Sequence, residues 1–344
     1  MQALILAGGR GTRLRPLTVY TPKPIVPMLN RPFVLYQIEM LREAGIYDIT
    51  LSLSYQPDKI ELLLGNGAEH GVSLRYITEP MPMGTGGAYK FAAGGFRETT
   101  IVLNGDILTD LDLKKMVRSH AGKKADATIA VHKVEDPTRY GLVKTDEDGK
   151  VVGFIEKPDT DIGINTINAG IYILEPTILD LIAKDENLSF EYDVFPEILK
   201  KRLAFYAFFF KKEYWKDIGT PESYWRAHMD MLEGKLARLR EDDAGPDAPD
   251  VATHASVDKA SVIGKNCTVK PGAVVVNSVL GEGVLVEERA VVENAVIWPY
   301  TRISVAAEIR DSVIGKSCHV GRNASVSSGS VIGDKSTLTD YTRV

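Results

Sequence analysis

The sequence predicts an α/β protein in which a doubly wound, mostly parallel sheet is followed by a C-terminal parallel β-helix. Over residues 1–235, short apolar runs typical of buried strands alternate with stretches whose apolar residues have helical spacing. In the segment 253–344, aliphatic residues recur mostly at steps of six, with a step of five at every third position. Between these domains, residues 236–252 contain the end of a helix and an acidic linker, EDDAGPDAPD.

Composition narrows the class of protein. A chain of 344 residues is too long for one ordinary core, and 44% apolar with 25% charged residues is typical of a soluble globular protein. A net charge of −5 argues against a general nucleic-acid binder. The two cysteines, Cys267 and Cys318, give neither a disulfide framework nor a metal-binding spacing. No apolar run has the length of a membrane span and the N-terminus lacks a signal pattern, so we expect a cytoplasmic protein without a membrane partner.

The N-terminal stretch predicts a phosphate-binding loop. The apolar run Ala3–Leu6 reads as a strand buried on both faces, and it leads directly into the sequence GGRGTR at residues 8–13. Glycines let the chain turn sharply and leave backbone N–H groups open to an anion. Arg13, Arg15 and Lys23 add positive charge after this loop, which suits a polyphosphate. The string matches neither the Walker pattern nor the dinucleotide fingerprint.

The rest of the first domain alternates strands and helices. We expect helices over residues 32–44, 58–64, 88–93, 111–117, 190–201 and 221–240, and strands over 49–54, 72–77, 100–106, 127–134, 151–155, 168–173 and 203–210. Asp106 follows a buried strand, so it lies at the carboxyl edge of the sheet and is a candidate Mg²⁺ ligand. Asp110 is placed to cap the helix that follows. The glycine-rich segment Met83–Ala88 opens the helix expected at 88–93, and its glycines would let the backbone approach a flat base or a sugar closely; the alternative is a plain loop.

The repeat near the C-terminus predicts three-sided coils. The distances 280 − 263, 297 − 280 and 314 − 297 are each 17 residues, which fits two steps of six and one of five. Three short strands per coil are the signature of a parallel β-helix, and we count between four and five coils. The open end of such a stack favours assembly, so we expect a homo-oligomer, a dimer or higher.

The string LAGGRGTRLRPLT, followed by PKP at residues 22–24, resembles the signature of the sugar-phosphate nucleotidylyltransferases, the NDP-sugar pyrophosphorylases. The resemblance covers about residues 1–235 and 250–344. It implies a Rossmann-like nucleotidyltransferase domain and a left-handed β-helix of hexapeptide repeats. Within the family, the segments TPKPIVPM, NGDI and YWKDIGTPESY look most like the enzymes that make GDP-mannose from GTP and mannose 1-phosphate.

The resemblance also implies roles for individual residues. Nucleotide binding falls to Leu6, Ala7, Gly8, Gly9, Gly11, Thr12, Arg13, Lys23, Gly84, Thr85 and Gly86. Sugar-phosphate binding falls to Gly141, Glu156, Lys157 and Asn168, and Mg²⁺ binding to Asp106 and Asp217. The residues implied to act in catalysis are Arg13, Lys23, Asp106, Lys157 and Asp217.

Three alternatives stay open. The first is the same reaction with glucose 1-phosphate and UTP, dTTP or ATP. Against the ATP enzymes, Thr21-Pro22 stands where the glucose adenylyl enzymes typically have Arg-Ala. A guanylyl transferase acting on heptose 1-phosphate is the second, since it resembles this chain in GTGGA and DIGTPESY. A catalytically silent regulatory subunit is the third; it would lack loop cations or metal carboxylates, which this chain retains.

Overall fold

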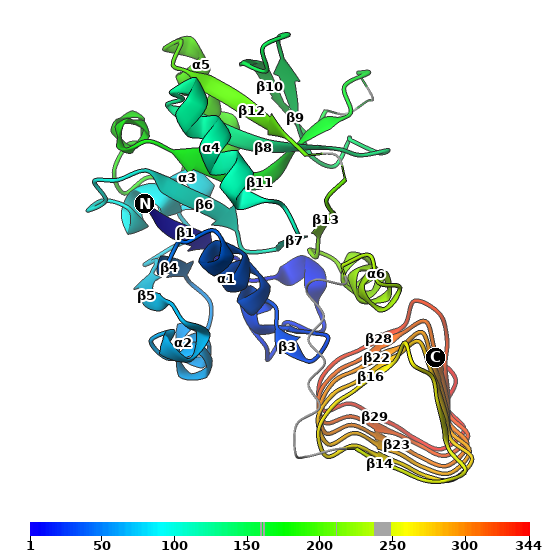
Figure 1. Cartoon of the computed structure of the whole chain (residues 1–344). Coiled ribbons are helices and arrows are strands. Elements are labelled where there is room, and N and C mark those ends of the chain that lie inside the picture. The colour runs from blue at the N-terminus through cyan, green and yellow to red at the C-terminus, as the bar shows by residue number, and fades with distance from the viewer. Residues whose placement is uncertain (159, 161, 211, 237–248) are drawn as a thin grey trace. The chain divides into compact units, whose positions relative to one another are not determined.

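The computed structural model describes residues 1–158, 160, 162–210, 212–236 and 249–344 (Figure 1). Spatial contacts divide the chain into two compact units. Unit 1 contains Met1–Arg10 and Val34–Trp215, and unit 2 contains Gly11–Phe33 and Lys216–Val344. These units follow packing, so they do not test the predicted functional boundaries at 235 and 253. Most of the predicted linker, residues 237–248, lies outside the described residues.

Unit 1 is built on a nine-stranded sheet with the path β10-β9-β11-β6-β1-β4-β5, to which β8 adds beside β11 and β12 beside β8. The strands are β1 (Gln2–Leu6), β4 (Asp48–Leu53), β5 (Ser73–Thr78), β6 (Thr100–Asn104), β8 (Ala127–Lys133), β9 (Gly141–Thr145), β10 (Val151–Glu156), β11 (Thr166–Leu174) and β12 (Phe205–Phe209). The strands β6-β1-β4-β5 are parallel to one another, and β12 is parallel to β8. Strand β11 pairs antiparallel with β6, and β9 and β10 form an antiparallel hairpin. The predicted doubly wound sheet is therefore confirmed.

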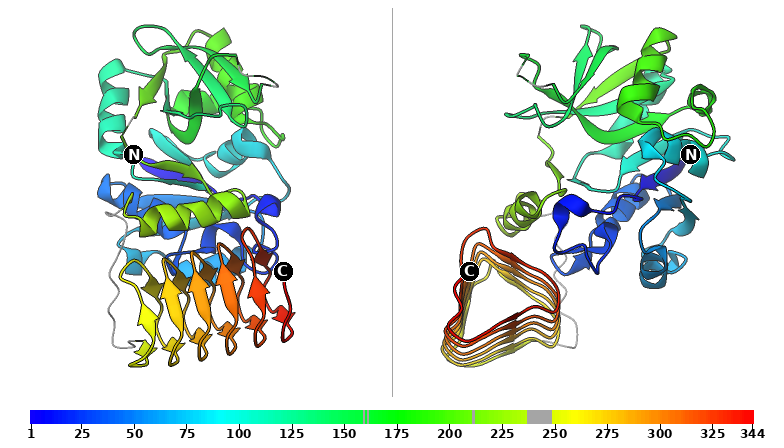
Figure 2. Two further views of the ribbon diagram at one scale, coloured as in Figure 1. Left: turned by 90° about the vertical axis from the view of Figure 1, so that its right-hand side faces the viewer. Right: turned by 180° about the vertical axis from the view of Figure 1, so that it is seen from behind.

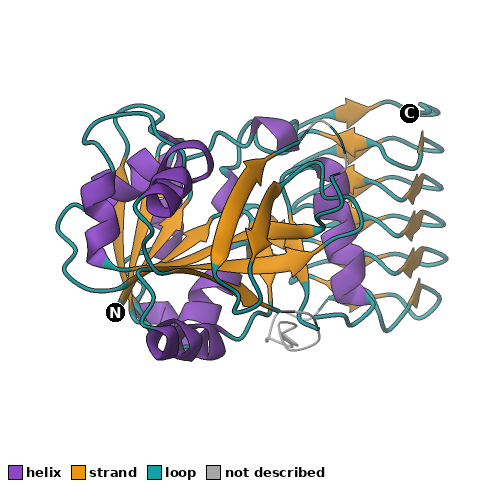
Figure 3. Cartoon of the chain, turned by 90° about the horizontal axis from the view of Figure 1, so that it is seen from above, coloured by secondary structure: helices purple, strands orange, loops and turns teal. Residues whose placement is uncertain are grey.

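Helices cover this sheet (Figure 3). They are α1 (Val34–Glu43), α2 (Pro57–Leu64), α3 (Gly84–Ala92), α4 (Leu113–Lys123) and α5 (Phe195–Lys200), with a π-helical turn at Phe190–Val194. Helix α3 packs on β1 and β4, and α4 packs on β8 and β12. The Gln37 amide of α1 donates to the carbonyls of Asn104 (2.8 Å) and Ile107 (3.1 Å), which fixes the end of β6.

Two local predictions in unit 1 were wrong. Helix α3 begins at Gly84 rather than at Ala88, so the glycine-rich segment forms the first turns of the helix. Helix α4 is capped by Asp112, which accepts from the backbone N–H of Lys115 at 3.0 Å. Asp110 instead accepts from the N–H of Tyr214 at 2.6 Å. Both errors arise because sequence spacing cannot tell a first helical turn from the loop that leads into it.

The C-terminal part of unit 2 is a parallel β-helix of triangular cross-section, with coils stacked one on another (Figures 1 and 2). Its three sheets have six, five and five strands. The first contains β14 (Asp250–Val251), β17 (Thr268–Val269), β20 (Leu285–Val286), β23 (Arg302–Ile303), β26 (His319–Val320) and β29 (Thr337–Leu338). The second contains β15 (Ser256–Val257), β18 (Val274–Val276), β21 (Val291–Glu293), β24 (Glu308–Arg310) and β27 (Ser325–Val326). The third contains β16 (Val262–Ile263), β19 (Val279–Leu280), β22 (Val296–Ile297), β25 (Val313–Ile314) and β28 (Val331–Ile332).

The registers confirm the predicted repeat. Val275 pairs with Val292 and Val292 with Ile309, and these aliphatic residues belong to the hydrophobic interior of the β-helix. The stack is longer than the predicted four to five coils, since β14 adds one strand to five complete coils. Its residues Asp250 and Val251 fall within the predicted linker.

Unit 2 also contains helix α6 (Pro221–Leu232) and the segment Gly11–Phe33, which we call the strap. The strap consists of two 3₁₀ turns, Thr12–Leu14 and Lys23–Ile25, and the short pair β2 (Pro27–Met28) and β3 (Arg31–Pro32). Thr220 starts α6 with a capping box to Ser223. The helix ends at Leu232, and the remainder predicted up to residue 240 lies partly outside the described residues. None of the helices in the described ranges is long and apolar enough to cross a bilayer.

Acidification should weaken unit 2 through His228. This histidine is fully buried in α6, and burial lowers its pKa from 6.5 to about 4. The unfolded chain therefore binds a proton that the folded chain rejects, so the free energy of unfolding should fall between pH 6.5 and pH 4 by on the order of 3 kcal/mol. Urea unfolding at pH 7 and pH 4.5 measures this loss. His228→Asn should reduce it, whereas the exposed-site control His254→Asn should leave it unchanged; an equal loss in all three proteins would contradict the assignment.

Candidate active site

In unit 1, the glycine loop after β1 is supported by a buried carboxylate that sequence reasoning missed. A Cβ atom added to Gly8 would lie 2.3 Å from Oε1 of Glu79. Glu79 accepts from the Ser52 hydroxyl at 2.9 Å and from the Met83 N–H at 3.4 Å. Burial raises the pKa of Glu79, against the lowering effect of these two hydrogen bonds. Glu79 thus joins the loop, β4 and the start of α3. No motif around Glu79 identifies it as a site residue in the sequence, so its role becomes visible only in the three-dimensional structure.

The glycines at the start of α3 have a packing explanation. Gly84 has a φ of 68°, and a Cβ there would meet the Leu188 carbonyl at 2.4 Å. The N–H groups of Gly86 and Gly87 both donate to this carbonyl, at 2.8 and 3.0 Å. The Thr85 hydroxyl donates to Glu191 at 3.1 Å. These residues therefore tie α3 to the segment before α5, and their predicted contact with the nucleotide stays a prediction.

The hairpin β9–β10 brings three of the predicted sugar-phosphate residues together. A Cβ on Gly141 would lie 2.5 Å from Oε2 of Glu156. Glu156 Oε1 forms an ion pair with Lys157 Nζ at 2.9 Å, and the Glu156 side chain is only 8% exposed, against 62% for Lys157. Oε2 of Glu156 is buried without a hydrogen-bond partner among the described residues. A buried carboxylate oxygen of this kind is suited to accept from a ligand hydroxyl.

Asn168 lies on β11 in a polar network. Its amide donates to the Tyr172 hydroxyl at 2.9 Å and to Glu191 Oε1 at 3.4 Å, and its Oδ1 accepts from the Gly170 N–H at 2.9 Å. Glu191 also accepts from the Ser189 hydroxyl at 2.7 Å. This glutamate was not predicted as a site residue, although it connects Asn168 to Thr85 on α3.

Asp106 lies where the phosphate loop and β6 meet. The N–H of Gly105 donates to the Leu6 carbonyl at 2.9 Å, and a Cβ on Gly105 would lie 2.7 Å from the same oxygen. This close approach places Asp106 beside the start of the glycine loop, at the carboxyl ends of β1 and β6, as predicted.

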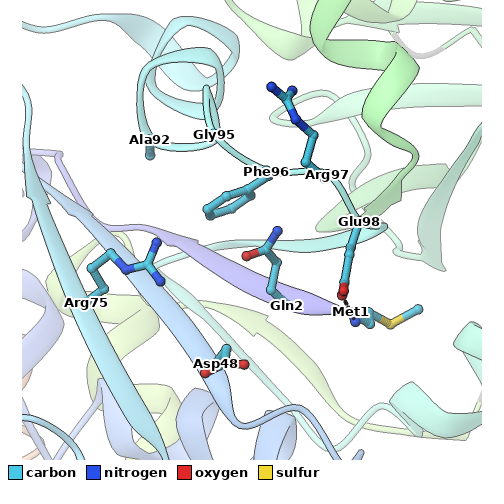
Figure 4. A pocket seen from close by; sticks show the side chains of 9 residues that line it. All are labelled: Met1, Gln2, Asp48, Arg75, Ala92, Gly95, Phe96, Arg97 and Glu98. Carbon is cyan, nitrogen blue, oxygen red and sulfur yellow. Dashed lines mark hydrogen bonds and ion pairs between the residues drawn. The ribbon is translucent and has the colours of Figure 1, made fainter.

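A separate hollow of about 390 Å³ lies at the opposite ends of these strands (Figure 4). Its lining includes Gln2, Asp48 and Arg75, which lie at the amino ends of β1 and β4 or on β5. The Met1 ammonium forms an ion pair with Glu98 at its rim. None of the predicted site residues lines this hollow, so it is distinct from the candidate site.

In unit 2, the strap carries the other predicted cations. Arg13 Nη2 lies 3.9 Å from Oδ2 of Asp217. A Cβ on Gly219 would lie 2.7 Å from Asp217 Oδ1 and 2.9 Å from Arg13 Nη2, so only glycine fits beside this pair. This role of Gly219 was not predicted from the sequence.

Lys23 is held against the glycine loop within the strap. Gly11 has a φ of 62°, and a Cβ on it would lie 3.2 Å from Lys23 Cβ and 3.1 Å from Thr18 Cγ2. The Thr18 hydroxyl donates to the Gly11 carbonyl at 2.7 Å. The predicted loop residue Thr12 begins the 3₁₀ turn that leads to Arg13. The strap therefore presents Arg13 and Lys23 from one compact local structure.

The donor set fits a hard divalent cation. The described residues contain no group of three or more His, Cys, Asp or Glu side chains placed to hold a metal ion. Mg²⁺ is commonly held by one or two carboxylates together with substrate phosphates and water, rather than by an all-protein cage. Asp106 in unit 1 and Asp217 in unit 2 each carry a carboxylate of this kind.

The family is decided by comparison with known proteins. Residues 2–234 match the family model described as nucleotidyl transferase. The chain belongs to the nucleotidyl transferase family. Residues 247–344 match a second model, described as the EIF2B subunit epsilon LbH domain, so this nucleotidyl transferase carries the predicted hexapeptide-repeat β-helix.

Several proteins with named activities are similar to this nucleotidyl transferase. The mannose-1-phosphate guanylyltransferase of Mycobacterium tuberculosis is 36% identical over 79% of this chain and 77% of its own length. Mannose-1-phosphate guanylyltransferase 1 of Arabidopsis thaliana is 34% identical over 99% of this chain and 93% of its own. The crystal structure of HddC from Yersinia pseudotuberculosis is similar with a TM-score of 0.58 and 37% identity, covering 67% of this chain and 99% of that chain.

Proposed function

We propose that this nucleotidyl transferase makes GDP-mannose and pyrophosphate from GTP and mannose 1-phosphate. The observation that carries the proposal is the match, over almost the whole chain, to proteins named mannose-1-phosphate guanylyltransferase. The proposal is supported by a glycine loop after β1, by cations on the strap and by a buried carboxylate beside a lysine.

The reaction needs charge neutralisation more than a base. A phosphate oxygen of the sugar 1-phosphate attacks the α-phosphorus of the nucleotide in line, the bond to the pyrophosphate oxygen breaks, and no proton has to be removed from the nucleophile. Bringing two anions together is therefore the main barrier, and positioning with electrostatic stabilisation lowers it. We assign Arg13 and Lys23 to the triphosphate, with the backbone of Leu6–Thr12 as its cradle, and Lys157 to the phosphate of the sugar.

Asp106 and Asp217 are the residues that we expect to hold Mg²⁺. When bound, this ion would offset negative charge on the phosphate oxygens. Asp217 also acts on the protein itself, since its Oδ2 lies 3.9 Å from Nη2 of Arg13 and orients that guanidinium.

The sugar is recognised, in our proposal, by Gly141, Glu156 and Asn168. The buried Oε2 of Glu156 is an acceptor for a sugar hydroxyl, and Gly141 leaves the space into which Glu156 fits. Asn168 is held rigidly by Tyr172 and by the Gly170 backbone, which suits a residue that must distinguish hydroxyl positions.

The charge on Lys157 should be protected at alkaline pH by its neighbour. The hydrogen bond from Lys157 to Glu156 raises the pKa of Lys157, although partial burial acts the other way. The KM for mannose 1-phosphate should therefore rise only above the usual range of a lysine, and Glu156→Gln should move that rise to lower pH. Steady-state kinetics from pH 7 to 11 measure the midpoint. Glu135→Gln, which removes an exposed carboxylate elsewhere, should leave it in place; an unshifted midpoint in Glu156→Gln would refute the coupling.

One experiment decides the substrates. Purified protein is given each of the four nucleoside triphosphates with mannose, glucose or heptose 1-phosphate, and pyrophosphate release is followed. GTP with mannose 1-phosphate should give the highest kcat/KM. Preference for glucose 1-phosphate with another nucleotide, or for heptose 1-phosphate, would replace the proposal by the corresponding alternative. Absence of turnover with every pair would favour a silent regulatory subunit.

Homo-oligomeric assembly and a cytoplasmic location stay predictions. Sedimentation velocity on the intact chain tests the first, and a dependence of mass on concentration is expected if copies associate through the β-helix.

A further inference from the structure

The third sheet of the β-helix has an outer face that is covered within unit 2. Neighbouring residues of a strand point to opposite sides, and Leu280, Ile297 and Ile314 belong to the interior core. Val279, Val296 and Val313 therefore point outward, yet each is only 1% exposed. Since a solvent-facing side of a β-helix does not bury three valines in a row, this face is a docking surface for other parts of the unit.

Hydrogen bonds identify the two segments that cover this face. The Asn30 amide of the strap donates to the Leu280 carbonyl at 2.8 Å. Trp225 Nε1 of α6 donates to the Asn294 carbonyl at 2.7 Å. Helix α6 runs across successive coils of the β-helix (Figure 2). Both the strap and α6 thus rest on the coils.

A third connection links all three parts in series. Trp298, next to the third sheet and 2% exposed, donates from Nε1 to the Tyr224 hydroxyl of α6 at 3.1 Å. The Tyr224 hydroxyl in turn donates to the carbonyl of Pro27 in the strap. Tyr224 is fully buried, and its ring lies edge-on to Trp298 and to His228. One hydroxyl therefore joins β-helix, helix and strap.

Pro27, where this series of hydrogen bonds ends, lies close to Lys23 in the sequence of the strap. Lys23–Ile25 form a 3₁₀ turn, the Val26 N–H donates to the Lys23 carbonyl at 3.3 Å, and Pro27 follows at the start of β2. Because only one residue separates this turn from Pro27, fixing the Pro27 carbonyl fixes the turn that carries Lys23.

We propose that Trp298 and Tyr224 are positioning residues for the nucleotide-binding strap, so that the β-helix sets the affinity of the enzyme for its nucleoside triphosphate. The proposal rests on the proposed function. It does not require either aromatic residue to touch substrate: Tyr224 restrains Lys23 through Pro27, and Trp298 fixes the hydroxyl of Tyr224 so that its proton is directed to Pro27.

The test compares three single-residue variants, each of which lacks one hydrogen-bonding group. Tyr224→Phe removes the hydroxyl, Trp298→Phe removes the donor that orients it, and Trp225→Phe removes a different hydrogen bond between α6 and the β-helix as a matched control. The KM for GTP should rise about fivefold to tenfold in Tyr224→Phe, as expected for the loss of one buried hydrogen bond, and by a smaller factor in Trp298→Phe. The KM for mannose 1-phosphate should not change, since its proposed residues are held by other contacts.

The kcat and KM values of these variants distinguish loss of strap positioning from simple destabilisation of the protein. A merely structural defect lowers the active fraction, so it reduces kcat and leaves the KM for GTP unchanged; this result in both Tyr224→Phe and Trp298→Phe would overturn the proposal. An equal rise of the KM in Trp225→Phe would also overturn it. Adding Trp298→Phe to Tyr224→Phe should raise the KM no further, because the two residues act in series. Turnover of the unmodified chain is measured first, so failure of the proposed function is recognised independently.

Discussion

Asp217→Asn and Asp106→Asn should each lower turnover at least about a hundredfold, because each removes a carboxylate from the expected Mg²⁺ site. For Asp217 a second effect adds to this, since the Arg13 guanidinium 3.9 Å away loses the charge that orients it. The measurement is kcat with GTP and mannose 1-phosphate across a series of Mg²⁺ concentrations, and both variants should need more Mg²⁺ than the unmodified enzyme.

A matched control is available on helix α4. Asp112→Asn makes the same chemical change at a helix cap, where asparagine caps as well as aspartate, so turnover should be unaltered. Turnover of Asp106→Asn or Asp217→Asn within a few-fold of the unmodified enzyme would remove that residue from the catalytic assignment.

Gly219→Ala should reduce kcat by roughly tenfold to a hundredfold, because displacement of catalytic groups by about an ångström has costs of this size. The new methyl group would lie 2.7 Å from Asp217 Oδ1 and 2.9 Å from Arg13 Nη2, so both side chains must move apart. Steady-state kinetics and thermal unfolding together measure the effect, and the melting temperature should change little because the strain falls on partly exposed side chains.

Gly122→Ala is the control for this substitution. Gly122 lies inside α4, and a Cβ added there meets nothing within 4 Å. Alanine favours a helix interior, so this variant should be at least as stable and fully active. If Gly219→Ala were equally active, the tight packing at Gly219 would have no catalytic consequence.

Sequence periodicity predicted most of the fold, because each repeating pattern reports a local geometry. The 17-residue repeat predicted the coil registers directly, as the pairing of Val275 with Val292 shows. Helix starts were less predictable: the glycines at 84, 86 and 87 look like a loop, yet they are required by close packing against a distant backbone. No local pattern encodes such a contact.

The candidate site shows the same division. The string GGRGTR pointed to the phosphate loop because its chemistry lies within a few residues, whereas Glu156 and Lys157 were assigned through the family resemblance. Glu79, Glu191 and Gly219 were missed as site residues, since each acts on a partner far away in sequence or through the space it leaves. The attachment of Tyr224 to Pro27, 197 residues apart, is of this kind as well.

The covered face of the β-helix has a consequence for protein engineering. A C-terminal domain taken from a relative could be joined at the linker, near residues 236–252. Such a join would place foreign coils against the native strap and α6, in place of the coils that Asn30, Trp225 and Tyr224 contact. Hybrids that transplant residues 11–33 and 216–344 as one cassette, leaving the sheet behind, should therefore retain nucleotide affinity better than hybrids joined at the linker.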